Sequence, residues 1–220
     1  MQLNHLHKWN VTPKEAIAIQ KDLSAQIIHD RPLDFDAITL VAGVDVSVKH
    51  NVSQAAVVVL TYPDLEVIET ALAKQPTPFP YVPGLLTFRE GPALIEAFEK
   101  LENTPDVFIF DGMGRIHPRR MGIASHLGLW LDKPTIGCGK THFIGDYDQP
   151  ASEKGSFAPL THKGEQLGIV LRTRTNVKPV YISPGHLCDI ASAQQLTLNC
   201  TPKYRLLRPV RLAHNAAGTL

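Results

Sequence analysis

A short apolar run at residues 107–110 ends on Asp111, and glycines follow at positions 112 and 114. The run is too short for a helix and is typical of a buried strand. A second apolar run, 134–138, leads into a glycine and then Lys140. Glycine permits tight turns and lets a ligand approach the backbone. The pattern predicts two neighbouring strands of an α/β sheet whose loop ends face a ligand. A solvated turn with a capping aspartate is the alternative, and it accounts for Asp111 alone but not for the cluster.

Three apolar segments precede this pair, at 38–48, 55–62 and 65–73. Valines alternate with polar residues near the end of the first segment, so Asp45 lies on the opposite side of a strand from its valine neighbours. Aspartate is disfavoured within strands, which makes Asp45 a candidate functional residue. A proline at position 63 marks a tight turn. We therefore expect an antiparallel meander of three strands.

The other elements are predicted from capping signals and apolar periodicity. Helices are expected from 13 to before 30, at 85–101, between the two central strands and at 188–198, and strands at 165–171 and 177–182. Glu90 lies early in the second helix. Residues 146–161 are predicted to form a polar loop, and the basic tail, 204–212, to lie on the surface. Neither a repeat nor a linker is present, so we expect a single domain over 1–220.

Residues 75–84 are rich in proline, so they form a stiff segment that excludes helix. Two aromatic residues, Phe79 and Tyr81, lie within it. The segment is either a rigid connector or a support that holds an aromatic side chain against a ligand.

The composition excludes several classes of protein. Hydrophobic residues make up 44% and charged residues 20%, as in an ordinary globule. No apolar run approaches the ~20 residues that span a bilayer, and the N-terminus lacks an apolar signal region. We expect a cytoplasmic protein without membrane contact. Cys138, Cys188 and Cys200 form no CxxC pair, which favours buried thiols over disulfides or zinc.

The net charge is only +1, but it is unevenly distributed. Residues 163–211 carry eight lysines and arginines against two acids, a net +6. This basic segment is either a surface that faces phosphates or a set of solvated strand edges that resist aggregation.

The order of the elements brings three acids together. In a right-handed crossover the strand that ends on Asp111 lies beside the strand that carries Asp45, and the intervening helix presents Glu90. Clustered carboxylates repel one another unless a cation lies between them, and carboxylate oxygens suit Mg²⁺ or Mn²⁺. Such sites are typical of phosphoryl chemistry. Strand order and acid placement resemble the ribonuclease H-like fold, an α/β fold in which three antiparallel strands and then parallel strands form a mixed sheet flanked by helices.

Five stretches sharpen the resemblance: VAGVDVSV (41–48), PYVPGLLTFREGP (80–92), DGMGRIHPRRMGIASHLGLWLDKPTIGCGK (111–140), PVYISPGH (179–186) and RPVRLAH (208–214). In this order they resemble the endonuclease V family. The resemblance implies a DNA repair endonuclease that recognises deoxyinosine. It implies Mg²⁺-assisted hydrolysis of the second phosphodiester bond 3′ of the lesion, with Mn²⁺ able to substitute. The products would be 3′-hydroxyl and 5′-phosphate ends, and the protein would act as a monomer.

The resemblance also implies roles for individual residues. Metal binding falls to Asp45, Asp111 and Glu90, and Tyr81 becomes a wedge that fills the gap left by a displaced base. Backbone groups and an apolar wall would read that base, at Gly84, Leu86, Gly112 and Ile123. Further catalytic residues near the scissile phosphate would be His117, Lys140 and His214. Other DNA contacts would come from Pro80, Val82, Pro83 and Arg119.

The sequence departs from the family pattern at three places. Members commonly have isoleucine where Val82 stands, histidine or asparagine where Met113 stands, and a valine-alanine pair at Cys138-Gly139. We expect the first to be conservative, the second to alter a contact close to the site, and the third to affect only packing.

Two alternative functions are considered. One is an inosine-specific endoribonuclease of the same fold. The other is a non-catalytic nucleic-acid-binding domain, against which the presence of all three acids argues. A nucleotide phosphotransferase lacks support because neither GxxxxGK[ST] nor GxGxxG is present.

Overall fold

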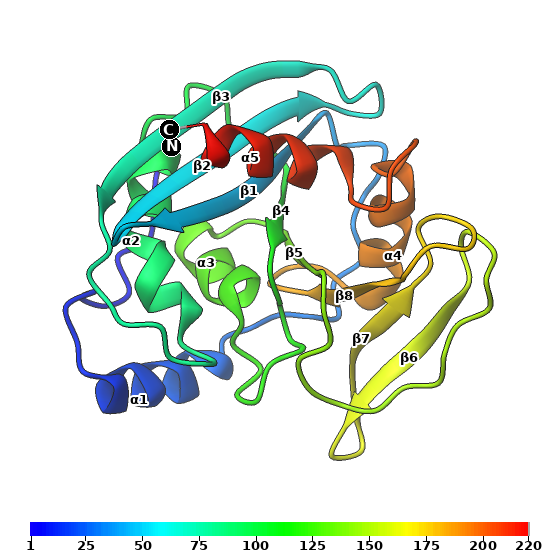
Figure 1. Cartoon of the computed structure of the whole chain (residues 1–220), viewed down its shortest axis with the longest axis horizontal. Coiled ribbons are helices and arrows are strands. Elements are labelled where there is room, and N and C mark those ends of the chain that lie inside the picture. Colours follow the sequence, from blue (N-terminus) through cyan, green and yellow to red (C-terminus); the bar gives the residue numbers. More distant parts are fainter. Residues whose placement is uncertain (220) are drawn as a thin grey trace.

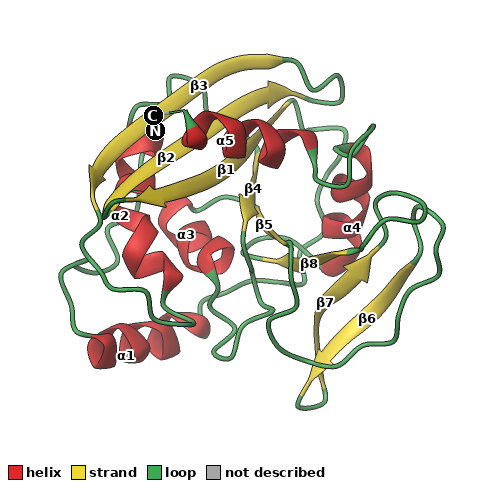
Figure 2. Ribbon diagram, viewed as in Figure 1, coloured by secondary structure: helices red, strands yellow, loops and turns green. Residues whose placement is uncertain are grey.

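The computed structural model describes residues 1–219 and contains one eight-stranded sheet with helices around it (Figure 1). The strands are β1 Leu40–Lys49, β2 Val52–Thr61, β3 Val67–Pro76, β4 Val107–Asp111, β5 Thr135–Gly139, β6 Phe157–His162, β7 Glu165–Leu171 and β8 Val180–Pro184. The helices are α1 Pro13–Ser24, α2 Leu86–Glu99, α3 Ile123–Leu131, α4 Ile190–Asn199 and α5 Arg208–Gly218. The order across the sheet is β3-β2-β1-β4-β5-β8-β7-β6, and Figure 2 distinguishes the element types.

The first three strands form the predicted antiparallel meander, with Asp45 of β1 opposite Ala56 of β2. Strand β2 is buried along nearly its whole length because helices cover both faces of the sheet there. A strand covered on both faces is typically a continuous apolar run rather than an alternating one, and residues 55–60 of β2 form such a run.

Strand β4 pairs with β1 in parallel, which confirms the expected mixed α/β sheet. The last pair in this ladder is Val44 with Phe110. The next residues in the two strands are Asp45 and Asp111, so the parallel register brings the two acids side by side. Strand β5 continues the parallel part, with Asp111 opposite Cys138.

The sheet separates two apolar cores. Val41 of β1 belongs to the core under α4 and α5, and its neighbour Ala42 to the core under α2 and α3. Side chains alternate between the faces of a strand, so Asp45 shares the face of Val41. Asp45 therefore points toward α5, which lies across β1 and β2 in Figure 1.

One strand was missed in the sequence. The predicted polar loop at 146–161 contains the start of β6, whose residues alternate between exposed and buried, with Ala158 and Leu160 inward. Strand β6 lies at the edge of the sheet, and Pro159 is tolerated there because an edge strand need not use every backbone N–H. The prediction was wrong because an edge strand with one solvated face has few apolar residues.

The prediction that 204–212 forms a surface tail was also wrong. Most of it belongs to α5, whose first turn contains Pro209, a favourable position for proline. Pro209, Val210, Ala213 and Ala217 are buried against the sheet. The small alanines let α5 approach the sheet closely.

Several other expectations hold. Helix α1 has the predicted capping box at Thr12 and Glu15, and the three cysteines are free and buried. Helix α2 forms as expected, with Pro92 in its interior. Within residues 1–219, no helix is both long and apolar enough to cross a membrane.

Replacement of Gly43 by alanine tests how closely α5 packs against β1. A Cβ at this position would lie 2.1 Å from the backbone carbonyl of Pro209, which cannot move without the helix. We expect Gly43→Ala to lower the free energy of unfolding by about 1–3 kcal/mol, measured by urea denaturation.

Gly218→Ala is the matched control, because a Cβ there meets no atom within 4 Å. The control should keep or slightly exceed the wild-type free energy of unfolding. Equal stability of the two variants would show that the contact between β1 and α5 is not tight.

Candidate active site

Two aspartates and a histidine form a compact group on the α5 face of the sheet. Asp45, Asp111 and His214 each offer a ligand atom within 4.8 Å of the others. His214 reaches in from α5, and its Nδ1 lies 2.7 Å from Asp45 Oδ2. Lys140, which follows β5, forms an ion pair with Asp111. The structure thus brings together four of the predicted site residues from four separate elements.

Negative charge is concentrated here in a partly desolvated place. Burial raises the pKa of Asp45, and the nearby charge of Asp111 raises it further, against the hydrogen bond to His214. Burial, followed by the charge of Asp45, raises the pKa of Glu90 to about 8. A cation between clustered carboxylates relieves their repulsion.

The donor set fits a hard divalent ion. Two carboxylates provide the oxygen ligands that Mg²⁺ and Mn²⁺ prefer, and an imidazole is compatible with Mn²⁺. Glu90, predicted as a third metal ligand, is not in the compact group. It belongs to α2, on the opposite face of the sheet from α5, and interacts with the two aspartates through their charges. The third member of the compact group is His214.

A cavity of about 320 Å³ adjoins this group, within the usual size range of ligand pockets. Asp111 belongs to the group and also lines the cavity, as does its ion-pair partner Lys140. All four residues predicted to contact a displaced base line the cavity, namely Gly84, Leu86, Gly112 and Ile123. Sequence positions almost forty residues apart thus meet in one pocket.

Two glycines shape the cavity wall. Gly84 has φ +80° and Gly112 has φ +153°, a backbone region that favours glycine. A Cβ on Gly112 would lie 2.7 Å from Ile123 Cγ2 and would displace that side chain. The wall at Ile123 therefore depends on the absence of a side chain at position 112.

The carbonyl of Gly84 accepts three side-chain hydrogen bonds. The donors are Gln20 Nε2 at 3.0 Å, His117 Nε2 at 3.0 Å and Arg119 Nη2 at 2.8 Å. Arg119 also donates to Gln20 Oε1 at 2.6 Å. This clamp holds the proline-rich loop at the mouth of the cavity, and it occupies the arginine that was predicted to contact DNA.

His117 lies in the cavity wall rather than beside the acids. Its Nδ1 accepts hydrogen bonds from the backbone N–H groups of Arg119 and Met121, so its Nε2 donates to Gly84. Burial, together with the charge of Arg119, lowers the pKa of His117 to about 4. The ring is therefore neutral at pH 7, and both nitrogens are engaged within the protein.

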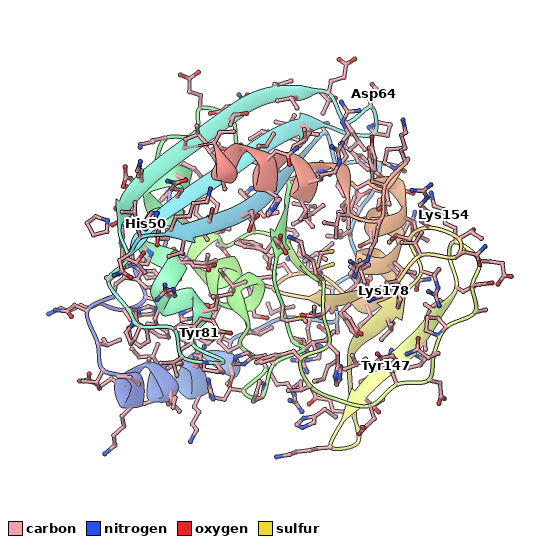
Figure 3. The ribbon with its side chains drawn as sticks, viewed as in Figure 1. His50, Asp64, Tyr81, Tyr147, Lys154 and Lys178 are labelled. Atoms are coloured by element: carbon pink, nitrogen blue, oxygen red, sulfur yellow. The ribbon has the colours of Figure 1, made fainter. Side chains whose placement is uncertain are left out.

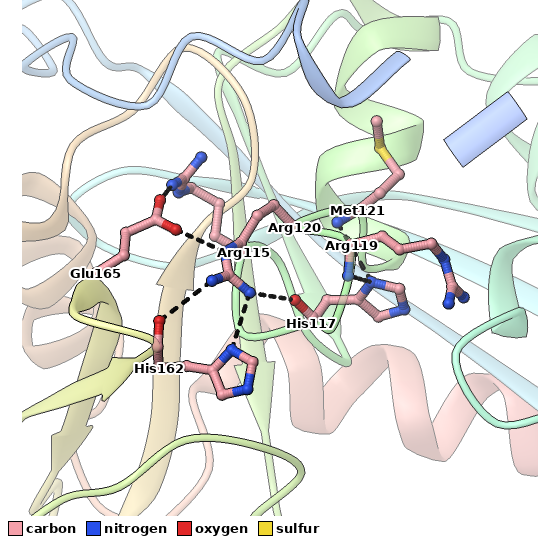
Figure 4. Close-up of polar contacts among 7 residues, drawn as sticks. All are labelled: Arg115, His117, Arg119, Arg120, Met121, His162 and Glu165. Atoms are coloured by element: carbon pink, nitrogen blue, oxygen red, sulfur yellow. Dashed lines mark hydrogen bonds and ion pairs between the residues drawn. The ribbon is translucent and has the colours of Figure 1, made fainter. Parts of the chain in front are cut away.

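The loop that carries His117 is fastened to the β6–β7 hairpin by a polar network (Figure 4). Glu165 forms ion pairs with Arg115 and Arg120. Arg120 Nη1 also donates to the carbonyl of His117 at 3.0 Å and approaches His162 Nδ1 at 3.2 Å. The hairpin, of which only β6 was not predicted from the sequence, thus anchors the loop that carries His117.

Tyr81 stands at the mouth of the cavity with 71% of its surface exposed. It belongs to the loop between β3 and α2, where Figure 3 labels it. Phe79, two residues earlier, is buried, and Arg89 Nη1 donates to its carbonyl at 2.9 Å. A firmly anchored loop thus presents one exposed aromatic ring.

Met113 and Gly139, two of the residues that depart from the family pattern, are in contact. A Cβ on Gly139 would lie 2.2 Å from Met113 Cε and 2.6 Å from its Sδ, so the methionine occupies the space that an alanine side chain would need. Met113 and Gly139 both line the cavity. The glycine is therefore matched to the methionine, and the pair shapes the pocket as well as the packing.

Part of the cavity lining was not predicted from the sequence. Thr87, Met121, Thr141, His142 and Phe143 also face the cavity. Phe143 is 39% exposed, and its ring centroid lies 5.9 Å from that of His117. Phe143 could have been predicted as a lining residue, because it is an aromatic residue just beyond the Gly139-Lys140 end of the predicted strand.

Comparison with known proteins places these features in one family. A family model described as Endonuclease V matches residues 21–215. The endonuclease V of Nostoc punctiforme is 51% identical over 214 residues, covering 96% of each chain. The crystal structure of the Streptomyces avermitilis endonuclease V has a TM-score of 0.91 at 42% identity, covering 96% of this chain and 93% of that one.

A third relative was crystallised with nucleic acid. The Ciona intestinalis endonuclease V, in complex with a 24mer DNA containing an inosine followed by a ribo-adenosine, has a TM-score of 0.79 at 29% identity. The alignment covers 93% of this chain and 95% of that one.

The raised pKa of Glu90 predicts a characteristic pH dependence of stability. Between its ordinary pKa of 4.5 and about 8, the folded protein keeps a proton on Glu90 that the unfolded chain releases. The free energy of unfolding should therefore fall with rising pH in this window, by on the order of 1 kcal/mol per pH unit. Glu90→Gln removes this dependence, so the metal-free variant should be more stable than wild type at pH 7.5 and similar to it near pH 5.

Glu99→Gln, at the exposed end of the same helix, is the control and should not change the pH profile. Urea unfolding in EDTA across pH 5–8 measures all three proteins. A Glu90→Gln effect of the same size at every pH would contradict the assignment.

Proposed function

The chain belongs to the endonuclease V family, and we propose that it is a repair endonuclease that recognises deoxyinosine in DNA. It would hydrolyse the second phosphodiester bond 3′ of the lesion and leave 3′-hydroxyl and 5′-phosphate ends. One observation carries the proposal: a pocket of about 320 Å³ is lined by Asp111, a member of an acidic group suited to a divalent ion, and by its ion-pair partner Lys140. The inosine-containing DNA bound by the Ciona relative supports this substrate.

The acidic group provides the hydrolytic centre. Asp45, Asp111 and His214 would hold Mg²⁺, or Mn²⁺ in its place, with Glu90 adding negative charge nearby. When bound, such an ion activates water and neutralises charge on the phosphate. The approach of a divalent charge would also favour the ionised form of Glu90, because an opposite charge lowers a carboxyl pKa.

Lys140 and His214 border this centre and suit contact with the scissile phosphate. Lys140 already neutralises Asp111, and a phosphate oxygen is an alternative partner for its ammonium group. His214 is more than half exposed and uses Nδ1 toward Asp45, which leaves Nε2 for a phosphate contact or a proton transfer.

The cavity would receive the displaced base. Main-chain groups near Gly84, Leu86 and Gly112 would contact its polar edge, and Ile123 would cover one face. His117 and Arg119 support this pocket by holding the Gly84 carbonyl, so we assign them positioning roles. Extrusion of a poorly paired base is less costly than that of a normal one, which favours lesions.

The central test is cleavage of an oligonucleotide with a single deoxyinosine. We expect nicking with Mg²⁺, none in EDTA, and a loss in Asp45→Ala larger than the ~10–100-fold that follows loss of an outer-shell partner. Asp148→Ala, an exposed acid elsewhere, should cleave like wild type. Mapping of the product ends locates the cut, and a matched riboinosine strand tests the RNA alternative.

Nicking that persists in EDTA, or in Asp45→Ala, would refute the metal-dependent mechanism. Cleavage confined to the riboinosine strand would replace the DNA assignment with the endoribonuclease.

The wedge role of Tyr81 is tested by binding. Tyr81→Ala should weaken binding to deoxyinosine DNA by ~1–3 kcal/mol, the value of one base–aromatic stack. Tyr81→Phe, which keeps the ring, should bind like wild type. Fluorescence anisotropy in Ca²⁺ measures these affinities, and an unchanged affinity of Tyr81→Ala would remove the wedge role.

A further inference from the structure

The basic segment, 163–211, contains two kinds of cation in the structure. Arg172 and Arg205 are engaged with the protein, each donating to backbone carbonyls. By contrast, the side chains of Lys203, Arg208 and Arg211 make no ion pair or hydrogen bond with any residue in 1–219. These three cations lie close together, and no acidic side chain pairs with them among residues 1–219.

They line a recess at the start of α5, which we call the α5 groove. It measures about 110 Å³ and is lined by Pro202, Lys203, Tyr204, Leu206, Arg208 and Arg211. The ring of Tyr204, 46% exposed, lies 4.4 Å from Arg211 Cζ and 5.6 Å from Lys203 Nζ. Arg211 Nε is buried without a hydrogen-bond partner among the described residues. Clustered cations and an unsatisfied guanidinium donor make this recess suited to an anion.

The size of the α5 groove limits what this anion can be. A volume of about 110 Å³ is well below the ~300 Å³ at which small-molecule pockets begin. A phosphate group fits, and arginine side chains match its oxygens with paired donors. An exposed tyrosine ring beside the phosphate offers an apolar surface to a sugar or base of the same strand.

Two structural connections link the α5 groove to the acidic group. Arg211 and His214 are three residues apart on α5, so they are surface neighbours separated by about 4.5 Å along the helix axis. Arg205, beside Tyr204 in sequence, donates to the carbonyl of Lys140 at 2.7 Å, and Lys140 pairs with Asp111. One chain of phosphates can therefore contact both places.

We propose that the α5 groove binds backbone phosphates of the nucleic-acid strand whose neighbouring phosphate lies at Asp45, Asp111 and His214. The proposal rests on the proposed function in taking nucleic acid as the ligand. Such contacts position a strand and do not read its sequence. The α5 groove would thus help to bring a strand into register with the acidic group whatever its bases.

The test is the salt dependence of binding to an undamaged single-stranded oligonucleotide in EDTA, followed by fluorescence anisotropy. Each lost phosphate contact should reduce the slope of log K against log salt by about 0.7, so Arg208→Gln/Arg211→Gln should reduce it by about 1.4. Lys163→Gln/Arg174→Gln is the matched control, because it removes the same charge from the same basic segment outside the α5 groove. Its slope should stay closer to wild type.

Lys203→Gln provides a second variant that keeps Arg211 on Tyr204, and its slope should fall by about 0.7. Equal slopes for the groove and control variants would overturn the proposal. So would loss of inorganic phosphate binding in the groove variant with an unchanged slope for DNA, which would indicate a small-anion site. Because the oligonucleotide is undamaged and no metal is present, failure of deoxyinosine cleavage would refute the proposed function without affecting this result.

Discussion

The parallel pairing of β1 with β4 is the interaction on which the site depends. Its register ends with Val44 beside Phe110, so the next residues, Asp45 and Asp111, must lie side by side on one face. Two partly buried carboxylates in that position repel each other, so burial and then the charge of Asp111 raise the pKa of Asp45. Lys140 and His214 offset part of the repulsion from two other elements. The fold therefore creates a local excess of negative charge that a divalent ion would relieve.

Asp111 belongs to both the pocket and the acidic group, so the two are parts of one site. Asp111 ends a buried strand, and the glycine that follows it opens the cavity wall at Ile123. The opposite wall is held by the three donors on the Gly84 carbonyl. Both walls are thus anchored to the buried sheet or to polar networks, which fixes the pocket beside the acids. Such preorganisation is what positions a substrate for reaction.

Much of this arrangement was predictable from the sequence because local signals agreed with the fold. Short apolar runs that end on Asp111 and before Lys140 indicated adjacent parallel strands, and an aspartate within a strand indicated Asp45. The failures have a common cause, since they concern elements stabilised by distant partners. Strand β6 depends on pairing with β7 at a solvated edge, and α5 depends on the close approach allowed by Gly43. The contact of His214 with Asp45, and the separation of His117 from the acids, follow only once α5 and the Gly84 clamp are in place.

The central claim is that Asp45 and Asp111 together hold one hard divalent ion. The most direct measurement is anomalous diffraction from crystals soaked in Mn²⁺, for wild type and for Asp45→Ala. The account predicts a peak bridged by carboxylate oxygens of Asp45 and Asp111 in the wild type and its loss in the variant. A wild-type map without a peak between these side chains, or a peak that persists unchanged in Asp45→Ala, would contradict it.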